Sequence, residues 1–119
     1  MSGTLTKAEM AARVLEHLGV KAEGQTASAD DNLAATDAID SAHSRLETDG
    51  RASFDLDAIP EWAWTPFRDY VARDLVDLFA ITGERLSSIL SSAARADRDL
   101  WAQQATKYDA TNYQTVKYF

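Results

Sequence analysis

Residues 59–83, IPEWAWTPFRDYVARDLVDLFAITG, decide the fold. Pro60 suits the first turn of a helix, where a missing backbone N–H costs nothing, and Gly83 is a stop signal. Pro66 predicts that the regular helical register begins only after Thr65. Apolar side chains recur in the segment at intervals typical of one helix face: Trp64, Phe67, Val71, Leu75, Leu78 and Phe79. The segment therefore predicts the central helix of a hydrophobic core.

Two further helices are expected before this segment. The first covers residues 6–18, where Thr6 and Glu9 form a capping box and a glycine follows the last apolar residue. The second covers residues 28–46, because Ser28 is an N-cap residue and apolar positions recur after it with helical spacing. The positions on that expected stripe are Leu33, Thr36, Ile39, His43 and Leu46.

Residues 51–60 connect the second helix to the third. Phe54 and Leu56 alternate with polar side chains there, a pattern compatible with a short strand or with an extended connector anchored by its apolar side chains. The connector is favoured, because no partner strand is evident in the sequence.

A fourth helix is expected from Glu84 to about Tyr108, with apolar positions that include Leu86, Ile89, Leu90, Ala93, Leu100 and Trp101. Beyond Asp109 the residue types favour extended structure or no regular structure, so the helix is expected to fray into a tail. We therefore predict an all-α fold, a bundle of about four helices in residues 1–109, followed by an extended C-terminal arm in residues 110–119.

The composition limits the class of protein. A chain of 119 residues with 45% hydrophobic and 26% charged residues matches one globular domain. It has no cysteine and two histidines, so disulfides and thiolate metal sites are excluded and zinc clusters are disfavoured. No apolar run approaches the ~20 residues of a membrane span, so no membrane partner is expected.

The charge is distributed unevenly. Between Lys21 and Glu61 the chain carries ten acidic and three basic side chains, which accounts for the whole net charge of -7. Affinity for nucleic acid comes mainly from Lys and Arg that neutralise phosphates, so tight DNA binding is not expected. A solvated surface is the simplest interpretation of the acidic segment.

Three polar side chains on the second helix could in principle hold a divalent cation. Asp37, Asp40 and His43 follow one another at steps of three, but no other element supplies further ligands. Solvated carboxylates and a hydrogen-bonded histidine at the edge of the core are the favoured interpretation. We expect no metal and no cofactor.

The remaining candidate groups also favour structural roles. Asp69, Arg73 and Asp77 lie four residues apart and predict ion pairs on a solvent-exposed helix face. His17, at the end of the first helix, is explained by the helix dipole, which favours a cation there. The serines of the fourth helix come with no nucleophile elbow, phosphate loop or evident base, so an enzyme is not expected.

The C-terminal residues resist a purely structural interpretation. Tyr113, Val116, Tyr118 and Phe119 lie within the last seven residues of a polar tail, where apolar side chains gain nothing from water. An extended segment of this kind can dock into a groove or add a strand to a partner's sheet. The alternative is that the tail packs back on its own bundle.

Three stretches together resemble a known family. They are the Pro-initiated aromatic helix of residues 59–83, the alanine- and arginine-bearing SSAARADRDLWAQQA of residues 91–105, and the closing VKYF of residues 116–119. Their order resembles the head–tail connector, or adaptor, proteins of tailed bacteriophages, over roughly residues 51–119. The acidic segment before them carries no matching motif.

The resemblance implies a small helical protein that forms a ring, typically of twelve copies, beneath the portal protein in the virion neck. Such a ring is assembled in the bacterial host cytoplasm, extends the DNA channel and offers a platform to the next neck or tail component. DNA would pass through the channel without sequence-specific binding. The family's C-terminal tail commonly contacts the portal, and carried over to this chain that anchor is Tyr113, Val116, Lys117, Tyr118 and Phe119.

Two other functions remain open at this point. The first is a small cytosolic interaction or regulatory module that docks one partner through the same tail. The second is a carboxylate-based hydrolase or metal enzyme, which requires a buried cluster of Asp and His side chains.

Overall fold

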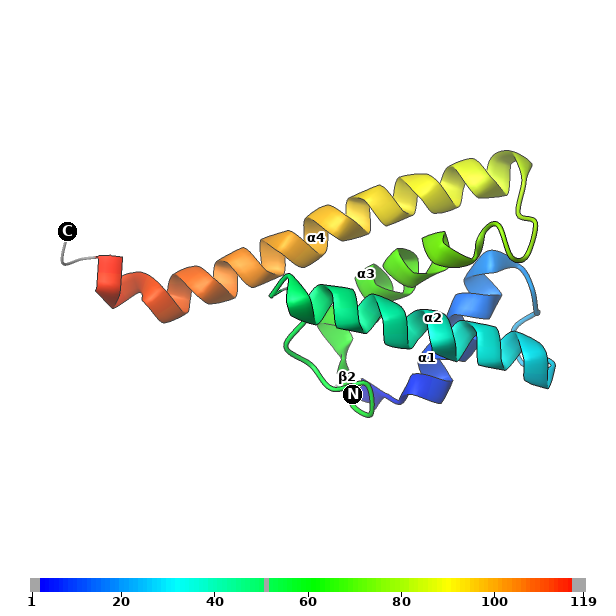
Figure 1. Ribbon diagram of the computed structural model, residues 1–119, viewed down its shortest axis with the longest axis horizontal. Coiled ribbons are helices and arrows are strands. Elements are labelled where there is room, and N and C mark those ends of the chain that lie inside the picture. The colour runs from blue at the N-terminus through cyan, green and yellow to red at the C-terminus, as the bar shows by residue number, and fades with distance from the viewer. Residues whose placement is uncertain (1–2, 51, 117–119) are drawn as a thin grey trace.

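The computed structural model describes residues 3–50 and 52–116, with side chains described as far as Ala102. Its elements follow the order β1 (Thr4–Leu5), α1 (Lys7–Leu18), α2 (Ala29–Thr48), β2 (Ile59–Pro60), α3 (Glu61–Ala72), the 3-10 turn η1 (Arg73–Leu75) and α4 (Gly83–Val116). The fold is mostly helical, with four α-helices and one very small sheet among the described residues (Figure 1). The predicted all-α helical bundle is confirmed.

The predicted N-terminal caps are present. At α1, Thr6 Oγ1 accepts a hydrogen bond from the Glu9 backbone N–H at 3.2 Å, and Glu9 Oε1 accepts one from the Thr6 N–H at 2.9 Å. At α2, Ser28 Oγ accepts from the Asp31 N–H at 3.1 Å. These bonds satisfy backbone donors that the first turn of a helix leaves without partners. The sequence therefore fixes where both helices begin.

One strand of the small sheet, β2, lies at the end of the segment that the sequence predicted as a connector, and its partner β1 precedes the first helix. β1 and β2 are antiparallel, with Leu5 opposite Ile59 and Thr4 opposite Pro60. Residues 52–58 form the expected irregular connector, and β2 begins directly after them. Strands of two residues are too short to show the alternating pattern on which strand prediction depends. The sheet ties the start of the chain to the start of α3.

Helix α3 becomes regular earlier, and ends earlier, than the sequence predicted. It is regular from Glu61, so Pro66 does not delay the helical register. The indole Nε1 of Trp64 donates to the carbonyl oxygen of Ile59 at 2.8 Å, which fastens the first turn to β2. After Ala72 the chain passes through η1 and a series of turns, where Ala80 has a positive φ of 53°. This left-handed backbone conformation is rare for a residue with a Cβ. Because Ala80 adopts it, one continuous helix cannot run from Glu61 to Gly83.

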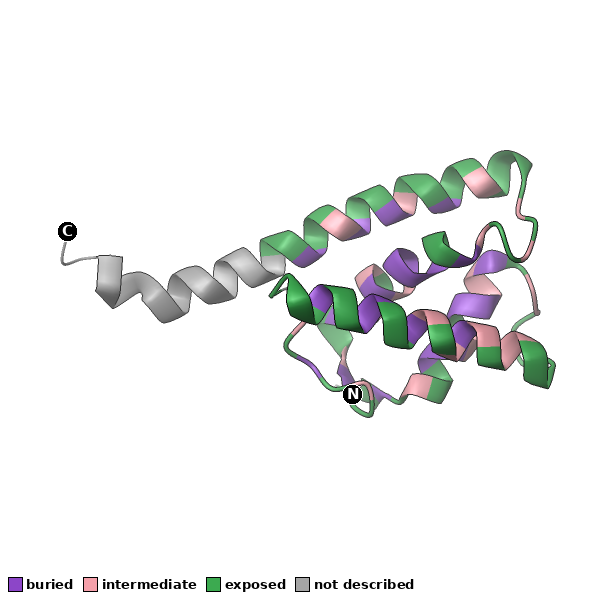
Figure 2. Ribbon diagram, in the orientation of Figure 1, coloured by how far each residue is buried: buried purple, intermediate pink, exposed green. Residues whose placement is uncertain are grey.

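The core is built around α3, as the sequence predicted. Helix α3 contacts α1, α2 and α4, and Figure 2 shows buried positions on the sides of the helices that face one another. Phe67 has no exposed surface and lies edge-on to Phe54, with ring centroids 5.3 Å apart. The largest side chains that are fully buried with it are Met10, Leu15, Leu18, Ile39, Leu46, Ile59, Ile89 and Leu100.

Helix α4 covers the body with one narrow stripe. Its buried residues are Ile89, Ala93, Ala96 and Leu100, at spacings of three and four. Beyond the body α4 continues to Val116, so it forms a projecting arm in Figure 1. The sequence predicted that the helix ends near Tyr108 and that residues 110–119 are extended. The backbone is instead helical through Val116, and residues 117–119 lie outside the described residues.

Candidate functional site

The predicted partner-binding residues lie on or beyond the arm. Tyr113 and Val116 belong to the last turns of α4, but their side chains lie outside the described residues. Lys117, Tyr118 and Phe119 lie outside them altogether. The structure describes the body from which the arm projects.

The base of the arm is held by the core. Leu100 is fully buried, and Ala93 and Ala96 lie against the body one and two turns before it. Small residues at these positions let the backbones of α3 and α4 approach closely. The direction in which α4 leaves the body is therefore set by packing between two helices.

Two tryptophans are exposed near this end of the body. Trp62 is 41% exposed and Trp101 is 48% exposed, whereas Trp64 is only partly exposed and is hydrogen-bonded. Trp62 still contacts the core, because its ring lies edge-on to Phe54 at 5.8 Å. Both Trp62 and Trp101 thus expose more than two fifths of their surface.

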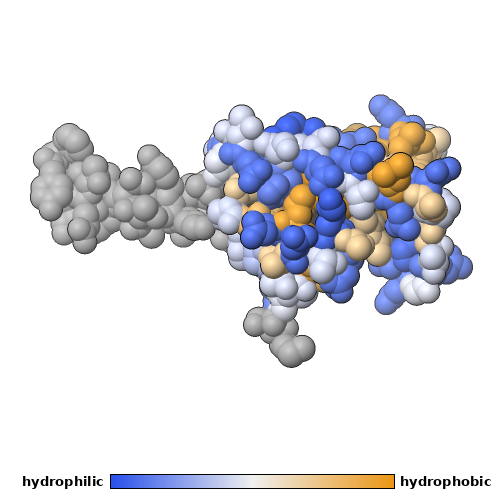
Figure 3. Space-filling model, turned by 60° about the horizontal axis from the view of Figure 1, so that its bottom comes forward, coloured by the Kyte–Doolittle hydropathy of each residue, from blue (hydrophilic) through white to orange (hydrophobic). Residues whose placement is uncertain are grey.

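Other exposed apolar side chains are scattered. Leu33, Leu78 and Leu90, each predicted on a buried stripe, expose 60%, 64% and 44% of their surface. Figure 3 shows one face of the molecule, on which hydrophobic residues form separate spots between hydrophilic ones. Single exposed apolar residues are normal for soluble proteins, so they do not define a docking site.

The three candidate metal ligands on α2 have different surroundings. Asp40 pairs with Lys7 at 3.1 Å, and Asp37 is exposed. His43 is buried: its Nε2 donates to the Phe54 carbonyl oxygen at 2.7 Å, and its Nδ1 lies 3.5 Å from Glu47 Oε1. This is the hydrogen-bonded histidine at the core edge that the sequence favoured. Within the described residues no three His, Asp or Glu side chains converge as a metal site.

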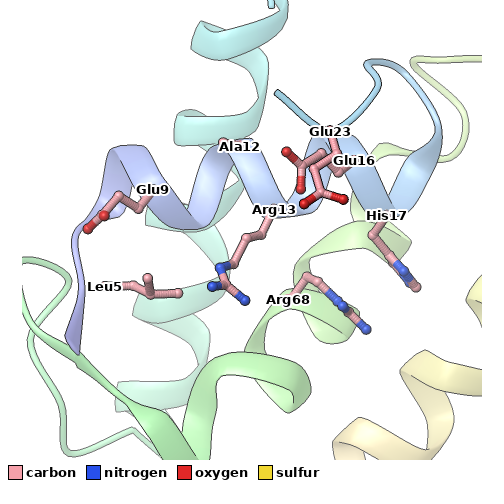
Figure 4. Close-up of a pocket in the computed structure, with 8 residues that line it drawn as sticks. All are labelled: Leu5, Glu9, Ala12, Arg13, Glu16, His17, Glu23 and Arg68. Atoms are coloured by element: carbon pink, nitrogen blue, oxygen red, sulfur yellow. The ribbon is translucent and has the colours of Figure 1, made fainter. Parts of the chain in front are cut away.

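A cleft opens between α1 and α3. Its volume is about 590 Å³, and the residues that line it are Leu5, Glu9, Ala12, Arg13, Glu16, His17, Glu23 and Arg68 (Figure 4). The Arg13 guanidinium lies over the Trp64 ring, 5.1 Å from the ring centre. Glu16 is paired with Lys21 at 3.0 Å. Positive and negative side chains are thus mixed on its walls.

A cluster of ionisable residues around the buried Asp69 lies beside this cleft, and His17 and Arg68 of the cluster line it. Asp69, on α3, is only 7% exposed and contacts both Arg68 and His17. His17 Nε2 lies 3.4 Å from Asp69 Oδ1, but it has no hydrogen-bond partner in the described part of the chain. On the α4 side, the Arg85 guanidinium donates to the backbone carbonyl oxygen of His17 at 3.3 Å. The cluster therefore joins α1, α3 and α4.

Two sequence predictions are wrong at this cluster. Asp69 was expected to pair with Arg73 on the surface, but it is buried and contacts Arg68 and His17. Arg73 instead lies over the Tyr70 ring at 5.1 Å. His17 was expected to act as a cation at the helix end. Its pKa is lowered from the ordinary 6.5, first by burial and then by the nearby charge of Arg68, so the neutral ring is favoured.

Few features of the sequence indicate this arrangement. A pair at i and i+4 indicates a surface ion pair, but it does not say which side of the helix is buried. One signal was present: Asp69 falls between Phe67 and Val71, close to the apolar stripe of α3. A carboxylate so close to a core stripe needs a cationic partner, and His17 is far away in the sequence.

The lowered pKa of His17 predicts how stability depends on pH. The unfolded chain binds a proton near pH 6.5, whereas the folded chain binds it at a lower pH, so unfolding takes up a proton between these values. This contribution to stability is complete above pH 6.5 and is lost as the pH falls through that interval. We expect His17→Gln to flatten this part of the profile of unfolding free energy against pH, measured by urea denaturation. An unchanged slope in the variant would contradict the prediction.

No protein-family model matches the chain, and neither a curated protein nor a solved structure matches it significantly. In the described residues, no helix is both long enough and apolar enough to cross a membrane. The function is therefore inferred from the chain itself.

Proposed function

We propose that this chain is a structural head–tail connector of a tailed phage or prophage. In this proposal it forms a ring beneath the portal protein, extends the DNA channel and joins the head to the tail. The observation that carries the proposal is α4. One helix is packed into the core as far as Leu100, and its backbone then leaves the body and continues to Val116.

A projecting helix suits a partner-binding element. Residues 103–116 continue a helix whose first half is fixed by the core, so the arm starts from a defined direction. Such an arm loses less conformational entropy on binding than a free tail does. Tyr113, Val116, Lys117, Tyr118 and Phe119 remain the proposed portal anchor.

The surface of α2 also supports the proposal. Helix α2 lies on one side of the body in Figure 1, and Asp30, Asp37, Asp40 and Glu47 on it are exposed. Carboxylates on the wall of a DNA channel repel phosphates and deny DNA the contacts that would hold it. In a ring, one face of each copy contacts a different face of the next, so the portal can template closure of monomers.

The experiment that tests the proposal compares baits in lysate of phage-producing source cells. The full-length chain is compared with a chain that ends at Ala110, and retained proteins are identified by mass spectrometry. All buried side chains of the described residues precede Ala102, so we expect the shortened chain to keep its urea unfolding midpoint while it loses a portal-sized partner.

Leu33→Ser in the full-length bait is the matched control, because Leu33 is 60% exposed on α2, within the body. This variant is expected to retain the partner. Equal recovery by the full-length and shortened baits would contradict the arm as an anchor. Recovery of a single cytosolic partner instead would favour the interaction module.

A further inference from the structure

At the α1–α3 cleft, one carboxylate oxygen of Asp69 is approached by two basic side chains, Arg68 and His17. Arg68 places Nε at 2.9 Å and Nη2 at 2.7 Å from Asp69 Oδ1. His17 Nε2 approaches the same oxygen, but only to 3.4 Å, and forms no hydrogen bond there. Arg68 therefore occupies the oxygen, and the imidazole lies beside it without a bond.

Charged groups surround the imidazole on every element that packs against it. Helix α3 contributes Asp69 and Arg68, and the start of α4 contributes Glu84 and Arg85, which line a hollow with His17. On its own helix, the neighbouring Glu16 is held by Lys21 at 3.0 Å. The nearest charges are thus one carboxylate and two guanidiniums, so a proton on His17 strains the present arrangement.

Of the three side chains that meet at Asp69 Oδ1, Arg68 is the most exposed. Its side chain is 29% exposed, whereas Asp69 and His17 expose only 9% and 18% of theirs. Arg68 also lines the cleft, and Figure 4 shows Arg68 and His17 directed toward the same side of it. A guanidinium that turns into the cleft keeps its hydration, whereas the Asp69 carboxylate is buried.

We propose that the cluster is an acid-sensitive switch in which protonation of His17 exchanges the partner of Asp69. An imidazolium forms charge-assisted hydrogen bonds at about 2.7–2.9 Å, so the ring must close on an oxygen that already accepts a hydrogen bond from Arg68 Nε and lies in ion-pair contact with Arg68 Nη2. Arg68 yields and turns into the cleft, beside Arg13. The cleft wall then carries Arg13 and an Arg68 that is no longer paired with Asp69. The wall therefore becomes more positive in acid. This device lies in the body and does not depend on the arm.

The test is an NMR titration of the full-length, ¹⁵N-labelled protein from pH 8 to pH 5. The ring nitrogens of His17 report its protonation, and the side-chain Nε–H resonance of Arg68 reports its hydrogen bond. We expect the Arg68 resonance to move with the same midpoint as His17, below pH 6.5. An Arg68 resonance that stays constant while His17 titrates, or that follows the titration of a carboxylate, would overturn the switch.

Two variants separate partner exchange from a general effect of acid. In Asp69→Asn the carboxylate that favours the charged ring is lost, so the His17 midpoint should fall further and Arg68 should no longer follow it. In His17→Gln the Arg68 resonance should be constant over the same interval. Continued movement of Arg68 in step with pH in either variant would also overturn the proposal. If His17→Gln does not fold, Asp69→Asn and the unaltered chain decide it.

Discussion

Phe67→Ala is expected to lower the free energy of unfolding by about 3–5 kcal/mol. Phe67 has no exposed surface and lies on the central helix. Its ring meets Phe54 at 5.3 Å and His43 at 6.3 Å, both edge-on. Alanine removes these contacts together with the transfer energy of the ring. The surrounding helices can close only part of the cavity, because they are also held by their other contacts.

Urea denaturation of full-length variants measures this loss. The matched control is Trp62→Ala, which removes a larger ring that also contacts Phe54 but is 41% exposed. Trp62→Ala should lower the free energy of unfolding by about 1 kcal/mol, which is the usual contribution of an aromatic–aromatic pair. Little more is lost, because the indole is already partly in water. A loss at Phe67 no greater than the loss at Trp62 would show that α3 is not the centre of the core.

The helices were predictable because their signals are local. The capping box of Thr6 and Glu9 and the N-cap at Ser28 each depend on residues three positions apart. Burial was less predictable, because a helical period gives the spacing of a stripe but not its edges. Leu33 and Leu78 fit the period, yet one lies near the start of α2 and the other in the turns after η1, where no helix covers them.

The sheet and the end of α3 were not predictable from local signals. β1 and β2 each have two residues, and their partners lie at opposite ends of the first half of the chain. The reversal after η1 depends on Ala80 in a left-handed conformation, for which alanine has no preference. Only the packing of α4 against α3 can select such a turn, and that packing is a long-range effect.

The prediction of a surface ion pair at Asp69 failed for a related reason. Asp69 and Asp77 each lie four residues from Arg73, so an isolated helix would pair either carboxylate with Arg73 equally well. The tertiary fold decides instead: Tyr70 takes Arg73 against its ring, while α1 brings His17 to Asp69. A predicted ion pair on one helix is thus replaced by a cluster shared among three helices.

Asp69→Ala should therefore be far more damaging than a surface carboxylate would be. Removal of one partner from a buried pair costs about 3–5 kcal/mol when the other charge is left without compensation. Arg68 is 29% exposed and can reach water in the cleft, so we expect about 2–3 kcal/mol at pH 7. His17, neutral at that pH, loses its nearest acceptor as well.

Asp77→Ala is the matched control, because Asp77 belongs to the same predicted surface series but is exposed, and its removal should change stability by no more than about 0.5 kcal/mol. The double variant Arg68→Ala/Asp69→Ala adds a second comparison. Without the guanidinium, the loss of the carboxylate leaves no buried charge, so part of the stability should return. If Asp69→Ala and Asp77→Ala cost the same in urea denaturation, Asp69 contributes only as a surface charge. The switch at the cleft would then have no buried carboxylate over which His17 and Arg68 compete.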